Sequence, residues 1–172
     1  MSPDPDTLRR DLARIAEQEA RLRLPTWSEA VAWQLGCRLR ELAAARGLAI
    51  TIEARLARET VFLSAMPGTA PTNADWARRK RNTVETLQRS SYAVHLQLAL
   101  EGGISLEAKL GLPARDHAAA GGCVPIRLAD GGACVGTLTV SGLPQRADHQ
   151  LVIEVLAEHL GVPFNTVALA DD

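Results

Sequence analysis

Apolar residues recur at helical spacing over the first 47 residues of the chain. Leu8, Leu12, Ile15 and Leu22 fall near one face of a helix that Asp6 can cap. Leu24-Pro25 ends this helix, because a residue before proline avoids the helical conformation. Thr26-Trp27-Ser28-Glu29 is a capping-box pattern, and the apolar period then continues to Arg46-Gly47, a cationic last turn followed by glycine. The pattern predicts two N-terminal helices.

After residue 47 the spacing of apolar residues changes to every second position. Residues 48–56 alternate between apolar and polar side chains, which predicts a half-buried strand, and residues 61–64 fit its hairpin partner. A third helix is expected from Thr72 or Asn73, continuing through 90–92 toward Leu98. Its inward residues are expected to be Trp76, Thr83, Val84 and Leu87.

The last third predicts a short helix, a hairpin and a terminal helix. The short helix covers 105–110, and strands 124–128 and 134–140 are joined by Asp130-Gly131-Gly132. The last helix is expected from Ala147 or Asp148 to Gly161, with residues 162–172 loosely held. Helices around hairpin-joined strands indicate an α+β fold with an antiparallel sheet. We expect one domain over 1–172 with its core at about 8–160.

Composition narrows the classes of protein. The 172 residues are 47% hydrophobic and carry a net charge of −1, which favours a globular protein and gives no reason to expect nucleic acid or membrane as a partner. The acidic, proline-broken beginning does not resemble a secretory signal. With three cysteines, an odd number, reduced thiols and a cytoplasmic location are expected.

Common catalytic signatures do not occur in the sequence. The four histidines and three cysteines form neither H-E-x-x-H nor C-x-x-C, so no metal site is predicted. The sequence also has no G-x-S-x-G, Walker loop or G-x-G-x-x-G. Whether the protein is an enzyme stays open at this point.

Two regions could nevertheless hold an anion. Residues 78–81 are four consecutive cations on a predicted helix, so at least one must approach the sheet; the alternative is a solvated face with one buried stem. The two ends of the predicted hairpin, Gly121-Gly122 and Ser141-Gly142, should be neighbours. A ligand pocket is therefore predicted, with His149 or His117 at its rim. Its predicted lining is Lys80, Arg81, Asn82, Gly121, Gly122, Ser141 and His149.

Asp148 is expected to act near the N-terminus of the last helix. A carboxylate there accepts hydrogen bonds from unpaired N–H groups, and its removal should cost about 1 kcal/mol.

The same regions resemble a known family. Lys80-Arg81-Asn82-Thr83-Val84, the Gly121-Gly122 pair and V-S-G-L-P-Q-x-x-D-H at 140–149 look like the haem-degrading-domain family, in its branch of uncharacterised cytoplasmic proteins. The resemblance implies a profilin-like or PAS-like fold with a five-stranded antiparallel sheet, a homo-oligomer of at least two copies, and haem as a cofactor in some relatives. Ala120 stands where the branch often has a histidine, and His117 where it has an aromatic residue.

Three hypotheses remain open from the sequence. The first, slightly favoured, is a module that binds haem or another small anionic ligand, with His117 or His149 as the haem ligand. The second is a redox enzyme of unknown substrate that uses Cys123 or His149. The third is an oligomeric protein-interaction protein whose pocket is vestigial.

Overall fold

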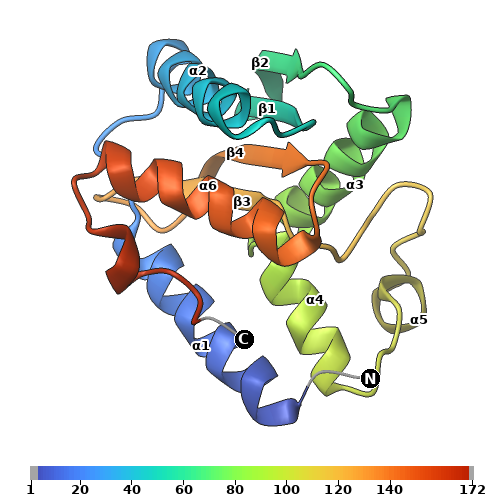
Figure 1. The fold of residues 1–172 in the computed structure, drawn as a ribbon. Helices are drawn as coiled ribbons and strands as arrows, with labels where there is room; N and C mark the ends of the chain where they lie inside the picture. Colours follow the sequence, from blue (N-terminus) through green and yellow to red (C-terminus); the bar gives the residue numbers. More distant parts are fainter. Residues whose placement is uncertain (1–3, 171–172) are drawn as a thin grey trace.

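The computed structural model describes residues 4–170. Within them, helices precede, interrupt and follow the strands of one sheet (Figure 1). The elements in chain order are α1 (Pro5–Arg21), α2 (Glu29–Arg46), β1 (Thr51–Leu56), β2 (Glu59–Ala65), α3 (Pro71–Leu87), α4 (Ser91–Leu100), α5 (Leu106–Leu110), β3 (Cys123–Arg127), β4 (Cys134–Ser141), α6 (Gln145–His159) and the 3-10 helix η1 (Phe164–Thr166). The α+β class is confirmed.

The sheet has the strand order β2-β1-β4-β3, and every pair is antiparallel. Within residues 4–170 it has four strands, so the expected fifth strand is wrong. The chain between β2 and β3 folds into α3, α4 and α5 instead, and residues 113–118 run along α3 and bond to it. No segment there is left to extend the sheet.

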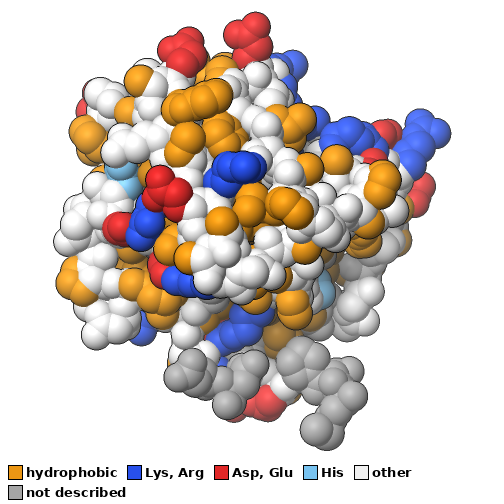
Figure 2. Space-filling model, turned by 45° about the horizontal axis from the view of Figure 1, so that its top comes forward, with side chains coloured by type: hydrophobic (Ala, Val, Ile, Leu, Met, Phe, Trp, Pro, Cys, Tyr) orange, Lys and Arg blue, Asp and Glu red, His pale blue; other side chains and the backbone are white. Residues whose placement is uncertain are grey.

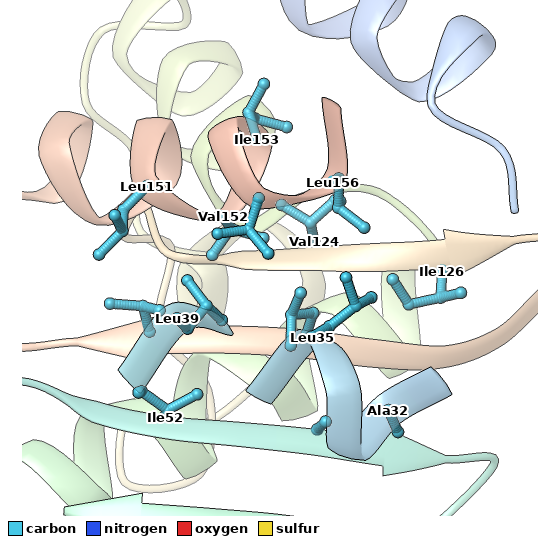
Figure 3. Close-up of a cluster of buried hydrophobic side chains, with 14 of the residues drawn as sticks. Ala32, Leu35, Leu39, Ile52, Val124, Ile126, Leu151, Val152, Ile153 and Leu156 are labelled. Atoms are coloured by element: carbon cyan, nitrogen blue, oxygen red, sulfur yellow. The ribbon is translucent and has the colours of Figure 1, made fainter. Parts of the chain in front are cut away.

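Both faces of β1 are buried, which the alternating pattern does not reveal. Ile52 and Ala54 join the main core with α2 and α6, whereas Thr51 and Glu53 lie under α3 on the other face. Figure 3 shows the first face, where Leu35 and Leu39 of α2 and Leu151, Val152 and Leu156 of α6 meet the strands. The expected half-buried strand is therefore wrong, because the polar residues of β1 find buried partners on α3.

Two further expectations fail between residues 71 and 100. Gln88 adopts a left-handed conformation with φ 57°, so α3 ends there and Ser90 caps a separate helix α4. Trp76 is 41% exposed and lies against the Arg79 guanidinium, 4.0 Å from the ring centroid, instead of pointing inward. Thr83 and Val84 are buried as expected.

Four helices begin at residues other than those predicted. Asp4, not Asp6, caps α1 by accepting from the Thr7 N–H at 3.2 Å. Ser28, not Thr26, caps α2, and Ala70 precedes α3 with no side-chain cap. Helix α6 starts at Gln145, directly after Pro144, which places Asp148 within its first turn.

The described part of the C-terminal tail is packed. Val167 and Leu169 are buried, and the Val167 carbonyl accepts a hydrogen bond from Gln18 Nε2 at 2.7 Å. The expected loose tail is wrong over residues 162–170, because α1 and α6 both bond to it. Residues 171–172, and residues 1–3 of the expected non-signal beginning, lie outside the described part.

The surface carries mixed charge. Lysine and arginine side chains are interspersed with aspartate and glutamate over the face shown in Figure 2. Within residues 4–170, no helix combines the length and apolar character needed to cross a membrane.

Candidate ligand groove

Two adjoining hollows lie between α3, α4 and the start of α6. The larger has a volume of about 580 Å³, and the smaller about 310 Å³. Trp76, Ala120 and Gln145 line both, so the hollows share a boundary. The larger is lined mainly by apolar residues of α4, α5 and residues 112–120, together with Arg79, His95 and His117.

The segment that walls the larger hollow is fastened to α3. Asn82 Nδ2 donates to the Asp116 carbonyl at 2.9 Å, and the Ala118 N–H donates to Thr83 Oγ1 at 3.0 Å. Arg78 adds an ion pair with Asp116 at 3.2 Å. The K-R-N-T block therefore has an evident structural role, since Asn82 and Thr83 hold residues 116–118 in place.

His95 belongs to a chain of hydrogen bonds with a defined direction. Its Nδ1 lies 3.1 Å from the Ala119 carbonyl, which can only accept, so Nδ1 carries the proton. Its Nε2 lies 2.9 Å from Gln145 Nε2, which donates, and Gln145 Oε1 accepts from the Gly121 N–H at 3.3 Å. The imidazole is neutral in this arrangement, and burial also lowers its pKa below the ordinary value.

His117 offers a second imidazole to the larger hollow. Its Nδ1 is buried and has no hydrogen-bond partner among residues 4–170. A buried imidazole nitrogen without a partner is costly unless a ligand or water satisfies it.

Lys80 reaches the sheet, as expected of one cation in the run. It is 3% exposed, and its Nζ lies 2.8 Å from Asp148 Oδ2 and 3.3 Å from the Val140 carbonyl. Lys80 lines the smaller hollow, but Asp148 already neutralises its charge. Burial raises the pKa of the Asp148 carboxyl, and Lys80 with two backbone N–H groups opposes that rise.

Asp148 does not act on the N–H groups of its own helix. It accepts from the backbone N–H groups of Gly142 at 3.3 Å and Leu143 at 3.0 Å, which precede α6, and from Lys80. The predicted capping role is corrected to that of an anchor between α3 and the turn before α6.

The glycine pair and the β4 exit are neighbours. The Val140 N–H donates to the Gly122 carbonyl at 2.8 Å, and Lys80 packs against Gly122. Ser141 is buried, and its carbonyl accepts from Asn73 at 3.4 Å. Arg81 lies elsewhere, because its guanidinium binds Glu53 at 2.6 Å under α3. Ligand binding by these residues stays a prediction.

His149 lies in the interior and not at a rim. It is fully buried, and its Nε2 bonds to Gln18 Oε1 at 2.8 Å. Burial lowers its pKa to about 3, so the ring stays neutral. His149 lines neither hollow, so His117, not His149, is the predicted histidine that lines the groove.

Cys123 does not have the properties of a reactive thiol. It is fully buried, it accepts from Thr139 Oγ1 at 3.0 Å, and burial raises its pKa to about 12. The nucleophile is the thiolate, which this environment disfavours. Among residues 4–170, no three His, Cys, Asp or Glu side chains are grouped to hold a metal ion.

Sequence reasoning missed His95 and Gln145. His95 sits in an apolar helical run, and its partner Gln145 is 50 residues away. The one available signal was Gln145 itself, which stands in the block on which the resemblance rests.

The chain is similar to a known protein family and to solved structures. The family model described as "Haem degrading protein HbpS-like" matches residues 28–157. A UPF0303 protein of Azotobacter vinelandii is 56% identical over 162 residues, covering 94% of this chain and 96% of that protein. The crystal structure of the Ybr137w protein has a TM-score of 0.81 at 25% identity, covering 87% of each chain. The crystal structure of a PduOC:heme complex has a TM-score of 0.64 at 18% identity, covering 77% of this chain and 94% of that one.

Proposed function

Because the chain belongs to the HbpS-like family of haem-degrading proteins, we propose that the groove binds haem or a related flat, carboxylate-bearing tetrapyrrole. The observation that carries this proposal is the mainly apolar hollow of about 580 Å³ with two imidazoles in its wall. An apolar hollow with a few placed polar groups is the usual form of a small-molecule site. The haem in the PduOC:heme complex supports the same class of ligand.

The residues present fit such a group. An imidazole with one nitrogen bonded to a backbone carbonyl and the other holding a lone pair is the common state of an iron ligand, and His95 has it. His117, whose Nδ1 has no hydrogen-bond partner among residues 4–170, adds a second imidazole to the wall of the hollow. When bound, iron would supply the redox and ligand-binding chemistry; the chain would supply an imidazole and an apolar wall.

Arg79 is the most suitable cation for a carboxylate of the ligand. Its guanidinium lies over Trp76 in the wall of the larger hollow and bonds to the half-exposed Asp75. Lys80, in contrast, is buried against Asp148. A carboxylate that replaced Asp75 at Arg79 would cost the fold little, because exposed ion pairs contribute little stability.

Titration with hemin tests the proposal. We expect a shifted Soret band with the wild-type protein, and a loss of affinity of about tenfold or more when the ligating histidine, His95 or His117, is changed to alanine. His159→Ala is the matched control, because His159 lies outside both hollows. Unchanged binding by the His95→Ala/His117→Ala double variant would exclude ligation by the histidines of the groove, and the absence of binding by the wild type would refute the proposal.

We also propose that the protein assembles with itself in the cytoplasm. Strand β2 forms one edge of the sheet, and Leu63 on it is 64% exposed; Trp33 of α2, which packs edge-on against Phe62 of β2, is 59% exposed. An exposed apolar edge strand is suited to pairing with a second copy about a twofold axis. All three cysteines are free thiols, which supports a reducing compartment.

Sedimentation at micromolar concentration checks the assembly. We expect a species of at least two copies, and the Trp33→Glu/Leu63→Glu variant should dissociate it because both charges would be buried against the partner. Trp76→Glu is the control, because Trp76 is also an exposed apolar residue but lines the two hollows and lies outside β2. A wild-type protein that sediments only at about the 18.4 kDa of one chain would contradict the proposal.

A further inference from the structure

Gln145 lies at the boundary between the two hollows of the groove. It lines both hollows, and its side chain bonds to His95 on one side and to Gly121 on the other. Its backbone is equally confined, since a Cβ on Gly121 would lie 2.1 Å from the Gln145 carbonyl oxygen. The backbone of Gln145 is therefore held close to Gly121, and this limits where its side-chain amide can lie.

The donors and acceptors on either side of Gln145 fix the orientation of its side-chain amide. The Gly121 N–H can only donate, so the amide oxygen of Gln145 must face it. The amide N–H then faces His95 Nε2, which must hold a lone pair. A protonated His95 would set N–H against N–H, and turning the amide over would repeat the same conflict at Gly121.

Within residues 4–170, the other groups around His95 make no hydrogen bond with its ring. Tyr92 of the same helix stacks on the ring with centroids 6.0 Å apart. From the other elements, Arg79, Glu107 and His117 line the same hollow, but the hydrogen bonds of the ring itself go to Ala119 and Gln145. The Gln145 amide is thus the group in direct contact with the lone pair.

We propose that Gln145 is a gate. In the free protein its side-chain amide donates to the lone pair of His95 Nε2, and a ligand that bonds to this nitrogen must first displace the amide. Displacement also removes a side chain that separates the two hollows, so it extends the space open to the ligand. This inference rests on the proposed function, because it needs a ligand that bonds to imidazole. It assigns to Gln145 a positioning role, since it acts through the state of His95.

Two variants separate the cap from the fold. Gln145→Met keeps the length of the side chain but frees the lone pair, and hemin affinity should rise about three- to tenfold. Gln145→Leu also frees the lone pair and has no atom that could bond to iron, so hemin affinity should rise by a similar factor.

Nitrogen NMR of the ligand-free protein gives a readout that needs no hemin. Wild type should show the neutral His95 ring with its proton on Nδ1 and with the Nε2 resonance shifted by the hydrogen bond from Gln145, and Gln145→Met should lose that shift. Gln34→Met, at an exposed glutamine of α2, should change neither the Nε2 resonance nor hemin affinity. If the Nε2 resonance of His95 is the same in Gln145→Met as in wild type, the cap does not exist and the inference is overturned. If the resonance moves but Gln145→Met binds hemin no more tightly than wild type, the gate is wrong while the proposed function stands. If none of these proteins binds hemin, the proposed function fails and the gate falls with it.

Discussion

Asp148→Ala is expected to lower the free energy of unfolding by about 3–5 kcal/mol, because it leaves the Lys80 ammonium buried without a counter-charge. The substitution also removes the acceptor of the Gly142 and Leu143 N–H groups. This is several times the effect of about 1 kcal/mol expected from a helix cap alone. Urea unfolding followed by circular dichroism measures the difference.

A double-mutant cycle isolates the pair. Lys80→Met with Asp148→Leu removes both charges, so the double variant should be more stable than Asp148→Leu alone, since a buried pair can be replaced by apolar residues at little net cost. Asp75→Ala is the matched control: Asp75 is half-exposed in its ion pairs with Arg78 and Arg79, and its loss should cost about 1 kcal/mol or less. Additive effects of the single substitutions would contradict a coupled pair.

Gly122→Ala should destabilise the protein by about 3 kcal/mol or more, because the new side chain would clash with its neighbours and the backbone conformation is unfavourable for alanine. A Cβ at this position would lie 2.3 Å from the Val140 carbonyl oxygen and 2.8 Å from Lys80 Nζ. The backbone also has φ 126°, a conformation that residues with side chains rarely adopt. Thermal and urea unfolding should both show the loss.

Gly131→Ala is the control for this position. It lies in the turn between β3 and β4, and a Cβ there would meet nothing within 4 Å. Its effect should stay within about 0.5 kcal/mol. A Gly122→Ala variant as stable as Gly131→Ala would show that the turn before β3 can shift away from β4 and Lys80.

Periodicity predicted the type of most elements, because each buries a regular face. The period of two located β1, and the Asp130-Gly131-Gly132 turn located the β3–β4 hairpin, whose register pairs Cys123 with Thr139. The break between α3 and α4 escaped it, because it depends on a left-handed Gln88 and not on proline or glycine. The burial of Glu53 escaped it too, since its partner Arg81 lies on a distant helix.

The sequence predicted several residues of the candidate site but not which of them bond to one another. Four consecutive cations required that one approach the sheet, and Lys80 does. Its pairing with Asp148 could not be inferred, because sequence distance does not show which buried charges meet. His149 was expected at a rim, yet the contact with Gln18 of α1 buries it.

The start of α6 bonds to three other helices through three of its side chains. Gln145 bonds to His95 of α4, Asp148 to Lys80 of α3, and His149 to Gln18 of α1. The consequence is a rule for how relatives of this chain can diverge. Substitutions at 145 and 95, at 148 and 80, and at 149 and 18 should be accepted as pairs, because a change in one member leaves a buried polar atom of the other without its partner.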